Sequence, residues 1–107
     1  MNTRLKTPIL LIEDNPADAD LIKIYLKDVG FKFELYQCDT LMEGFDLIET
    51  RGIELALLDL TLPDSTGFKT VTTFLEKAPD VPLIVLTGLN NEIIGNQAIK
   101  AGAQDFL

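Results

Sequence analysis

The fold is decided by one stretch, LALLDLTLPDSTG, which covers residues 55–67. Its first four residues are apolar and run directly into a carboxylate, Asp59, and the segment behind it contains Pro63 and Gly67, two residues typical of turns. A near-continuous apolar run predicts a strand that is buried on both faces, as in a parallel sheet. The next helix starts about eight residues later, too far away for Asp59 to be its cap. Because ligands of open α/β sheets bind at the carboxyl ends of the strands, Asp59 is predicted to be a functional residue of the site.

Composition and charge exclude several classes of protein. The 107 residues predict a single domain over residues 1–107, and 47% hydrophobic with 24% charged residues is ordinary globular usage. The net charge of −8 argues against direct binding of nucleic acid or of an anionic membrane. No apolar run is long enough to span a membrane, and the short polar start of the chain does not resemble a signal peptide.

The cysteine and histidine counts narrow the chemistry further. Cys38 is the only cysteine, so no internal disulfide can form, and a reducing, cytoplasmic location is expected. We interpret Cys38 as a small residue at a strand end rather than as a reactive thiol. The chain has no histidine, which excludes a histidine nucleophile, general base or metal ligand from within it.

A second apolar run, residues 8–12, predicts the first buried strand of the chain. Two acids, Glu13 and Asp14, follow its carboxyl end. Asn15 is predicted to cap the helix that comes next, with Pro16 at its first position. The first strand therefore places two carboxylates at the same end of the sheet as Asp59.

The helix that starts at Pro16 is expected to have one apolar face and to end at Gly30. Ile24 falls outside this face, so its side chain is expected to be exposed; whether it docks a partner is left open. The apolar face is predicted to comprise Leu21, Ile22, Tyr25, Leu26 and Val29.

The rest of the chain alternates strands and helices. Alternating apolar and polar residues over 31–37 predict a half-exposed edge strand. A capping box from Thr40 to Glu43 starts the next helix, in which Gly44 indicates close packing against the sheet. The later elements are predicted to be a helix over 67–77, a strand over 82–86, a short helix over 91–101 with Ile94, Ala98 and Ala101 facing inward, and the start of a fifth strand at 105–107.

This alternation predicts an α/β fold with a parallel sheet and right-handed helical crossovers. The expected strand order is 2-1-3-4-5, the flavodoxin-like doubly wound arrangement, with helices alternating between the two faces of the sheet. That order puts the first and third strands side by side, so Glu13 and Asp14 are expected beside Asp59. Thr87, at the end of the fourth strand, is expected one strand further along.

Three carboxylates in one crevice require a neutralising partner. Each like-charge pair at ~5 Å repels by about 3 kcal/mol at an effective dielectric constant of ~20. Oxygen ligands without histidine or cysteine favour Mg²⁺ or Mn²⁺, which binds one or two carboxylates, a carbonyl group and several waters. The predicted ligands are Glu13, Asp14, Asp59 and the backbone carbonyl of Thr61.

A cation at this site would prepare it for phosphoryl transfer. One carboxylate can then act as the nucleophile on a phosphoryl group whose oxygens the metal shields. The hydroxyl of Thr87 can donate a hydrogen bond to an oxygen of the transferred group, and Gly88 leaves room for that group.

The residues resemble the response-regulator receiver domains of two-component signalling. The similarity rests on four short motifs, which lie in the right order over essentially the whole chain: residues 12–15 (IEDN), 58–67 (LDLTLPDSTG), 85–88 (VLTG) and 101–107 (AGAQDFL). The resemblance implies that Asp59 accepts a phosphoryl group from a phosphohistidine on a sensor kinase or a phosphotransfer protein. It also implies that Glu13 and Asp14 hold Mg²⁺ and that Thr87 contacts the phosphoryl group. An output domain or a downstream protein is then the expected receiver of the signal.

Phe106 occupies the position of the family's aromatic switch residue. If Thr87 moves toward a phosphoryl group, the ring of Phe106 is expected to fill the space that Thr87 leaves. The alternative, a fixed core aromatic, remains open at this stage.

The chain departs from the family pattern at its C-terminal end. The family has a lysine that pairs with the phosphoryl group and then a fifth helix, and this lysine would fall two residues beyond Leu107. We expect that the end of the domain is missing, so that the fold is truncated within the fifth strand and lacks the fifth helix. A molecule that ended here would expose apolar surface, which favours formation of a homodimer or segment exchange.

Two other classes of function remain open. One is a receiver-like binding module that phosphorylation does not switch, although the presence of Glu13, Asp14, Asp59 and Thr87 argues against it. The other is an enzyme, either an FMN electron carrier or a Mg²⁺-dependent phosphatase. The acidic loop after the first strand would repel an FMN phosphate, and no general acid or base for a foreign substrate is evident.

Overall fold

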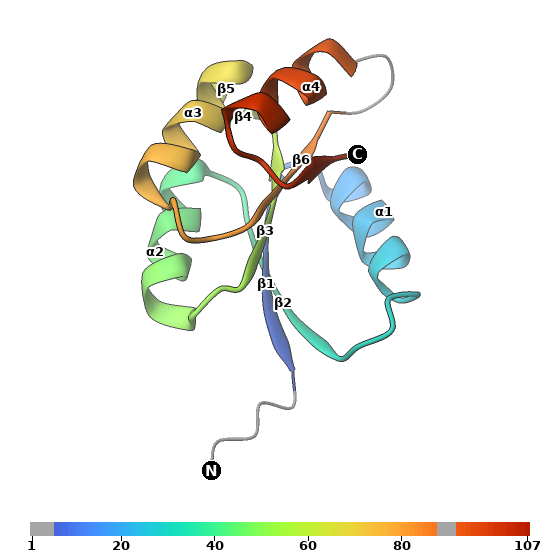
Figure 1. Ribbon diagram of the computed structural model, residues 1–107. Coiled ribbons are helices and arrows are strands. Elements are labelled where there is room, and N and C mark those ends of the chain that lie inside the picture. Colours follow the sequence, from blue (N-terminus) through green and yellow to red (C-terminus); the bar gives the residue numbers. More distant parts are fainter. Residues whose placement is uncertain (1–5, 88–91) are drawn as a thin grey trace.

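The computed structural model describes residues 6–87 and 92–107. Strands alternate with helices along these residues (Figure 1). In chain order the elements are β1 (Thr7–Ile12), α1 (Pro16–Leu26), β2 (Phe33–Cys38), α2 (Leu41–Arg51), β3 (Leu55–Asp59), β4 (Thr61–Leu62), β5 (Ser65–Thr66), α3 (Phe68–Lys77), β6 (Leu83–Leu86), α4 (Glu92–Ala101) and β7 (Asp105–Phe106).

The main sheet has five parallel strands in the order β2-β1-β3-β6-β7. This confirms the predicted order 2-1-3-4-5, because β6 and β7 are the fourth and fifth strands of that prediction. β2 lies at one edge, as its alternating sequence indicated. The turn-rich segment after Asp59 contains an element that was not predicted, a small antiparallel hairpin of β4 and β5.

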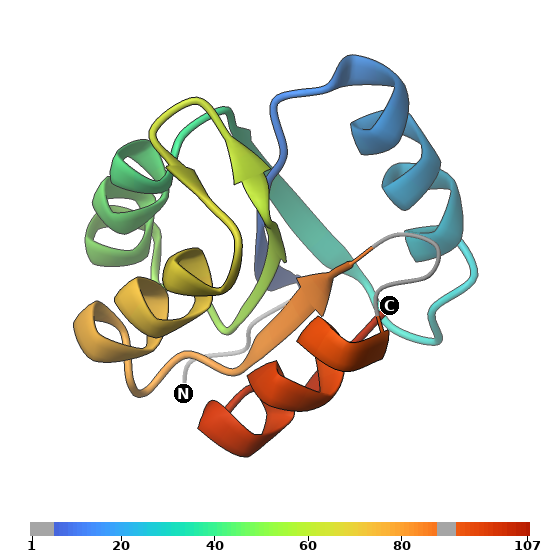
Figure 2. The same ribbon diagram turned by 90° about the horizontal axis from the view of Figure 1, so that it is seen from above.

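The helices do not alternate between the faces of the sheet, and this prediction was wrong. α1 packs alone on one face with Ile9, Leu11 and Leu57, whereas α2, α3 and α4 share the core on the other face (Figures 1 and 2). The reason is the handedness of the crossovers. The chain moves outward once from β1 to β2 and then always in the opposite direction, so right-handed connections put one helix on the first face and all later helices on the second.

The core on the face of α2, α3 and α4 is the larger of the two. Phe74 of α3 is fully buried in it, and its ring lies 5.8 Å from the ring of Phe45 in α2. α2 approaches the sheet closely through Gly44, because a methyl group at that position would overlap the side chain of Ile12. This confirms the predicted reason for a glycine inside that helix.

The buried face of α1 differs from the prediction. Ala19 and Leu26 are buried, whereas Leu21 and Tyr25 are 49% and 64% exposed. The small side chain of Ala19 lets the helix lie close to the sheet, and this selects the stripe at i, i+3 and i+7 that runs through Ile22. The neighbouring stripe therefore faces outward, together with Ile24, whose predicted exposure is confirmed at 57%.

The helix termini follow their sequence signals except at the end of α1. The side chain of Asn15 accepts hydrogen bonds from the first turn of α1, and Thr40 caps α2. α1 stops at Leu26, before Gly30, and α4 leaves Ala101 exposed although it was predicted to face inward. None of the helices in the described part of the chain has the length and apolar character needed to cross a bilayer.

Candidate functional site

Three carboxylates meet at the carboxyl ends of two neighbouring strands. Ile12 at the end of β1 pairs with Leu58 of β3. Glu13 and Asp14, which directly follow β1, therefore lie next to Asp59, the last residue of β3. One carboxylate oxygen from each of the three side chains lies within 4.8 Å of the others. The structure therefore brings together the acids that the strand order predicted to be neighbours.

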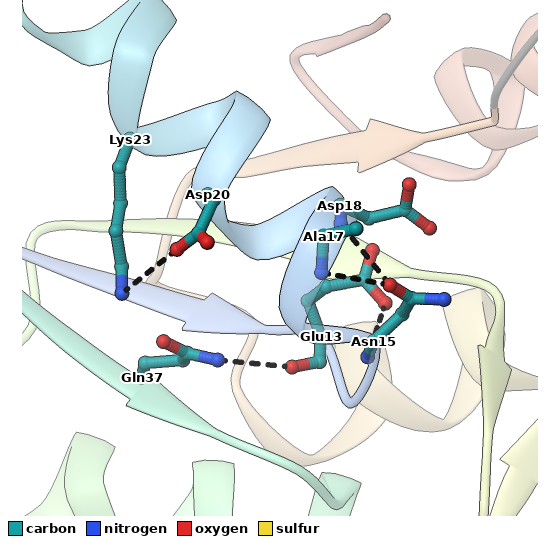
Figure 3. A network of polar contacts seen from close by, with 7 residues as sticks. All are labelled: Glu13, Asn15, Ala17, Asp18, Asp20, Lys23 and Gln37. Atoms are coloured by element: carbon teal, nitrogen blue, oxygen red, sulfur yellow. Dashed lines mark hydrogen bonds and ion pairs between the residues drawn. The ribbon is translucent and has the colours of Figure 1, made fainter.

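Glu13 is the buried member of this acidic cluster, which we define as Glu13, Asp14 and Asp59. Its side chain is only 3% exposed, and the backbone N–H of Asn15 donates to its Oε2 at 3.3 Å. The amide Nε2 of Gln37, on β2, donates to the backbone carbonyl of Glu13 at 3.3 Å (Figure 3). Asn15, which caps α1, and Gln37 of β2 thus both hold the turn between β1 and α1 in place.

Burial strongly affects the protonation of Glu13. The pKa of its carboxyl group is raised to about 7, chiefly by desolvation and also by the negative charges of Asp59 and Asp18, while the hydrogen bond from Asn15 opposes the shift. A hydrogen bond joins the side chains of Glu13 and Asp59. Near neutral pH and without a cation, Glu13 is therefore partly protonated.

Asp59 is half-buried at the end of β3. Burial raises the pKa of its carboxyl group, and the backbone N–H groups of Thr61 and Leu60 oppose this shift. The N–H of Thr61 donates to Oδ2 of Asp59 at 3.2 Å. One oxygen of the carboxylate is thus fixed by the backbone directly behind it.

The donor set of the cluster fits a hard divalent cation. Its ligand atoms are carboxylate oxygens, and the set contains neither thiol nor imidazole. Burial and the neighbouring negative charges raise the pKa of Glu13, and a divalent cation would offset both effects on its ionised form. Thr61 lies in β4, two residues beyond Asp59, where its carbonyl is a further candidate ligand.

Thr87 follows β6, next to Leu86, which pairs with Asp59. Its backbone N–H and its hydroxyl both donate to the backbone carbonyl of Leu107, at 2.8 Å and 2.9 Å. The predicted hydrogen bond to a phosphoryl group would require this hydroxyl to exchange its partner. Gly88, which was predicted to leave room for that group, lies outside the described residues.

Phe106 lies in β7, where it pairs with Val85 of β6. Its half-buried ring packs directly against Gly95 of α4, so closely that a methyl group on Gly95 would overlap the ring. This close packing is a structural reason for a glycine in the middle of α4. The predicted switch residue is therefore in contact with α4.

Gln37 is a contributor that sequence reasoning missed. A polar residue near the carboxyl end of the strand beside β1 is the signal that could have revealed it. The register pairs Gln37 with Leu11, two residues before Glu13. Only the strand pairing shows that the amide reaches this turn, which explains why spacing along the chain gave no indication of it.

Comparison with known proteins identifies the family. Residues 9–107 match the family described as "Response regulator receiver domain", which covers nearly the whole chain. This chain belongs to that family. The cell cycle transcriptional regulator CtrA of Caulobacter vibrioides is 34% identical to the receiver domain over 99 residues, or 92% of the chain. The receiver domain spans 42% of the length of CtrA.

Solved structures support the same assignment. The signal receiver domain of a protein described as a LuxO repressor from Vibrio parahaemolyticus has a TM-score of 0.78 and 29% identity, and the match covers 96% of this receiver domain and 78% of that chain. A response regulator from Burkholderia pseudomallei, solved with a phosphorylated aspartic acid and a calcium ion, has a TM-score of 0.72 and 26% identity, with 95% and 59% covered. The receiver fold is thus shown by structure as well as by sequence.

Proposed function

We propose that this receiver domain accepts a phosphoryl group on Asp59 from a phosphohistidine of a sensor kinase or a phosphotransfer protein. The observation that carries the proposal is the acidic cluster at the ends of β1 and β3, in which Asp59 is half-buried between two further carboxylates. The chain contains no histidine, so the donor must belong to another protein or another domain. The domain would act in the cytoplasm, where a free thiol such as that of Cys38 stays reduced.

Glu13, Asp14, Asp59 and the carbonyl of Thr61 would hold Mg²⁺. When bound, the cation shields the negative oxygens of the phosphoryl group, so that an anionic nucleophile can approach. An oxygen of Asp59 forms the new P–O bond while the P–N bond to the donor imidazole breaks, and the imidazole nitrogen keeps the electron pair. The N–H of Thr61, which donates to Oδ2, orients the Asp59 carboxylate for this attack.

Thr87 would stabilise the transferred phosphoryl group and transmit the effect of phosphorylation to β7 and α4. Its hydroxyl now donates to the carbonyl of Leu107, beyond the end of β7. On phosphorylation the hydroxyl would turn to a phosphoryl oxygen, which removes one of the two hydrogen bonds that the Leu107 carbonyl accepts from Thr87. The resulting change at β7 and α4 is the signal offered to an output domain or a downstream protein.

The related structure from B. pseudomallei, which contains a phosphorylated aspartic acid and a calcium ion, supports this proposal. The receiver domain would act as a signalling domain whose chemistry is confined to its own phosphorylation and dephosphorylation. A receiver-like module that is not switched by phosphorylation would need no nucleophile at this place, and the backbone hydrogen bond that orients Asp59 favours the phosphoacceptor.

The test is labelling by a small phosphodonor such as acetyl phosphate in the presence of Mg²⁺. We expect one label, on Asp59, which hydroxylamine removes because an acyl phosphate is cleaved by it. Asp59→Asn should take no label, whereas replacement of the exposed Asp28, two residues beyond the end of α1, by Asn should leave labelling as in the parent. Mass spectrometry that locates the label on another residue, or equal labelling of Asp59→Asn, would contradict the proposal.

A further inference from the structure

The hairpin that follows Asp59 in the chain forms hydrogen bonds with two helices, α2 and α3. It is formed by β4 and β5 and closed by a hydrogen bond from the N–H of Gly67 to the carbonyl of Leu60 at 2.7 Å. Leu60 and Leu62 anchor it in the core, where both side chains are buried. The hairpin determines the position of Thr61, and Thr61 donates its N–H to Asp59.

Asp64, at the turn of this hairpin, reaches across to α2. Its Oδ1 accepts from the N–H of Leu41 at 3.0 Å and its Oδ2 from the N–H of Met42 at 3.1 Å. These N–H groups belong to the first turn of α2 and have no partner within that helix. The carboxylate also lies at the positive end of the helix dipole, so its charge strengthens both hydrogen bonds.

α2 has a second cap, Thr40, which directly precedes the helix in the chain. The hydroxyl oxygen of Thr40 accepts from the N–H of Glu43 at 3.1 Å. Because Thr40 already supplies the ordinary cap of α2, the bonds from Asp64 do more than complete the helix: they tie it to a loop 22 and 23 residues further along the chain. In Figure 2 the yellow-green hairpin lies at the end of the sheet between α2 and β3.

The opposite strand of the hairpin is tied to α3. The hydroxyl of Ser65 is 2.7 Å from the hydroxyl of Thr70, which is fully buried in α3. The hairpin thus spans two helices that pack against the same face of the sheet. Of its two ties, the one to α2 is made by an ionised side chain at an exposed turn.

We propose that Asp64 is a positioning residue for phosphoryl transfer. By capping α2 it holds the hairpin so that Thr61 keeps its N–H on Asp59 and its carbonyl stays available as a candidate ligand of the cation. This role rests on the proposed function, because Thr61 matters only if Asp59 is the phosphoacceptor. Nothing in the spacing of the chain indicated it, since the carboxylate acts on a helix that precedes it in the sequence.

The test compares two variants that each remove one cap from the same helix. Asp64→Ala loses the tie between α2 and the hairpin, whereas Thr40→Ala loses a cap of α2 without affecting the hairpin. We expect Asp64→Ala to lower the rate of labelling by acetyl phosphate at limiting Mg²⁺ at least about threefold, since two charge-assisted hydrogen bonds are lost. Raising Mg²⁺ to saturation should recover part of this loss, and Asp64→Asn, which keeps one acceptor oxygen, should fall between Asp64→Ala and the parent.

Hydrogen exchange provides a readout that does not depend on labelling. In Asp64→Ala the amides of Thr61 and Gly67 should exchange faster, and in Thr40→Ala they should exchange as in the parent. Equal labelling of Asp64→Ala and Thr40→Ala, or unchanged exchange at Thr61 in Asp64→Ala, would overturn the role of Asp64. A parent that takes no label on Asp59 would instead overturn the proposed function, so the two failures are distinguishable.

Discussion

At the scale of single residues, the acidic cluster places the buried Glu13 beside the half-buried Asp59, the proposed nucleophile. Glu13 is 3% exposed, yet it is ionisable and lies beside two other carboxylates. A buried carboxyl without a cation keeps its proton because the charged form loses its hydration. The protonation of Glu13 therefore reports directly on whether the cluster is neutralised by a metal.

The stability of the metal-free protein is expected to fall as the pH rises from about 4.5 to about 7. Glu13 has a pKa near 7 in the folded chain against an ordinary value of 4.5, so the folded state binds the proton more tightly than the unfolded state. This contribution to the free energy of unfolding is complete below pH 4.5 and is lost as the pH passes through 7. Urea unfolding in EDTA across this range measures it.

Glu13→Gln is the matched variant for this experiment. It has the same shape but cannot ionise, so the difference in unfolding free energy between parent and variant should move in favour of the variant as the pH rises. A difference that stays constant from pH 5 to pH 8 would contradict the raised pKa of Glu13.

At the scale of elements, α4 and β7 pack closely where Gly95 meets the ring of Phe106. Gly95→Ala should destabilise the domain, since overpacking costs about 1–3 kcal/mol while the gain in helix propensity is only about 1 kcal/mol. Phe106→Leu in the same chain should recover most of this loss by removing the ring that the methyl group meets. Urea unfolding of the single and double variants tests the coupling.

Gly30→Ala is the control for that series. A Cβ atom at Gly30 would meet nothing within 4 Å, so its effect should stay within about 0.5 kcal/mol. Losses in Gly95→Ala that persist unchanged after Phe106→Leu would show that the ring is not what the methyl group displaces.

The coupling from Thr87 to Phe106 is a second prediction at this scale. Beryllofluoride, a mimic of the phosphoryl group, should draw the Thr87 hydroxyl away from the Leu107 carbonyl and so alter hydrogen-exchange protection in β7 and in α4. Thr87→Ala should bind the mimic with little change at these elements. Protection that changes in the hairpin after Asp59 but not in α4 or β7 would rule out this route.

At the scale of the whole molecule, repulsion within the acidic cluster is expected to lower the melting temperature of the metal-free protein. Asp14→Asn should raise the melting temperature in EDTA, since it removes a negative charge from a cluster of three acids whose ligand atoms lie within 4.8 Å of one another. Mg²⁺ should raise the melting temperature of the parent and raise that of the variant less, because ligand binding stabilises the folded state by RT ln(1 + [L]/Kd). A parent that melts at the same temperature with and without Mg²⁺ would show that the three acids do not share a cation.

Much of this architecture was predictable because it depends on patterns close together in the chain. The apolar runs ending at Asp59 and Glu13, together with the helical crossovers, were enough to predict the strand order and hence the meeting of the three acids. The stripe that α1 buries was not predictable, because Ala19 and Leu21 are both apolar and only the approach to the sheet selects between them. The cap by Asp64 was equally hidden, since it links segments that become neighbours only after folding.

The raised pKa of Glu13 has a calorimetric consequence. A cation binds the ionised carboxylates, so at pH 7, where Glu13 is about half protonated, Mg²⁺ should expel about half a proton into the buffer. The heat measured on titration then contains the ionisation enthalpy of the buffer and should differ between Tris and phosphate. That difference should shrink at pH 8.5, where the proton has already left. The difference in heat between the two buffers therefore measures how many protons are released when Mg²⁺ binds.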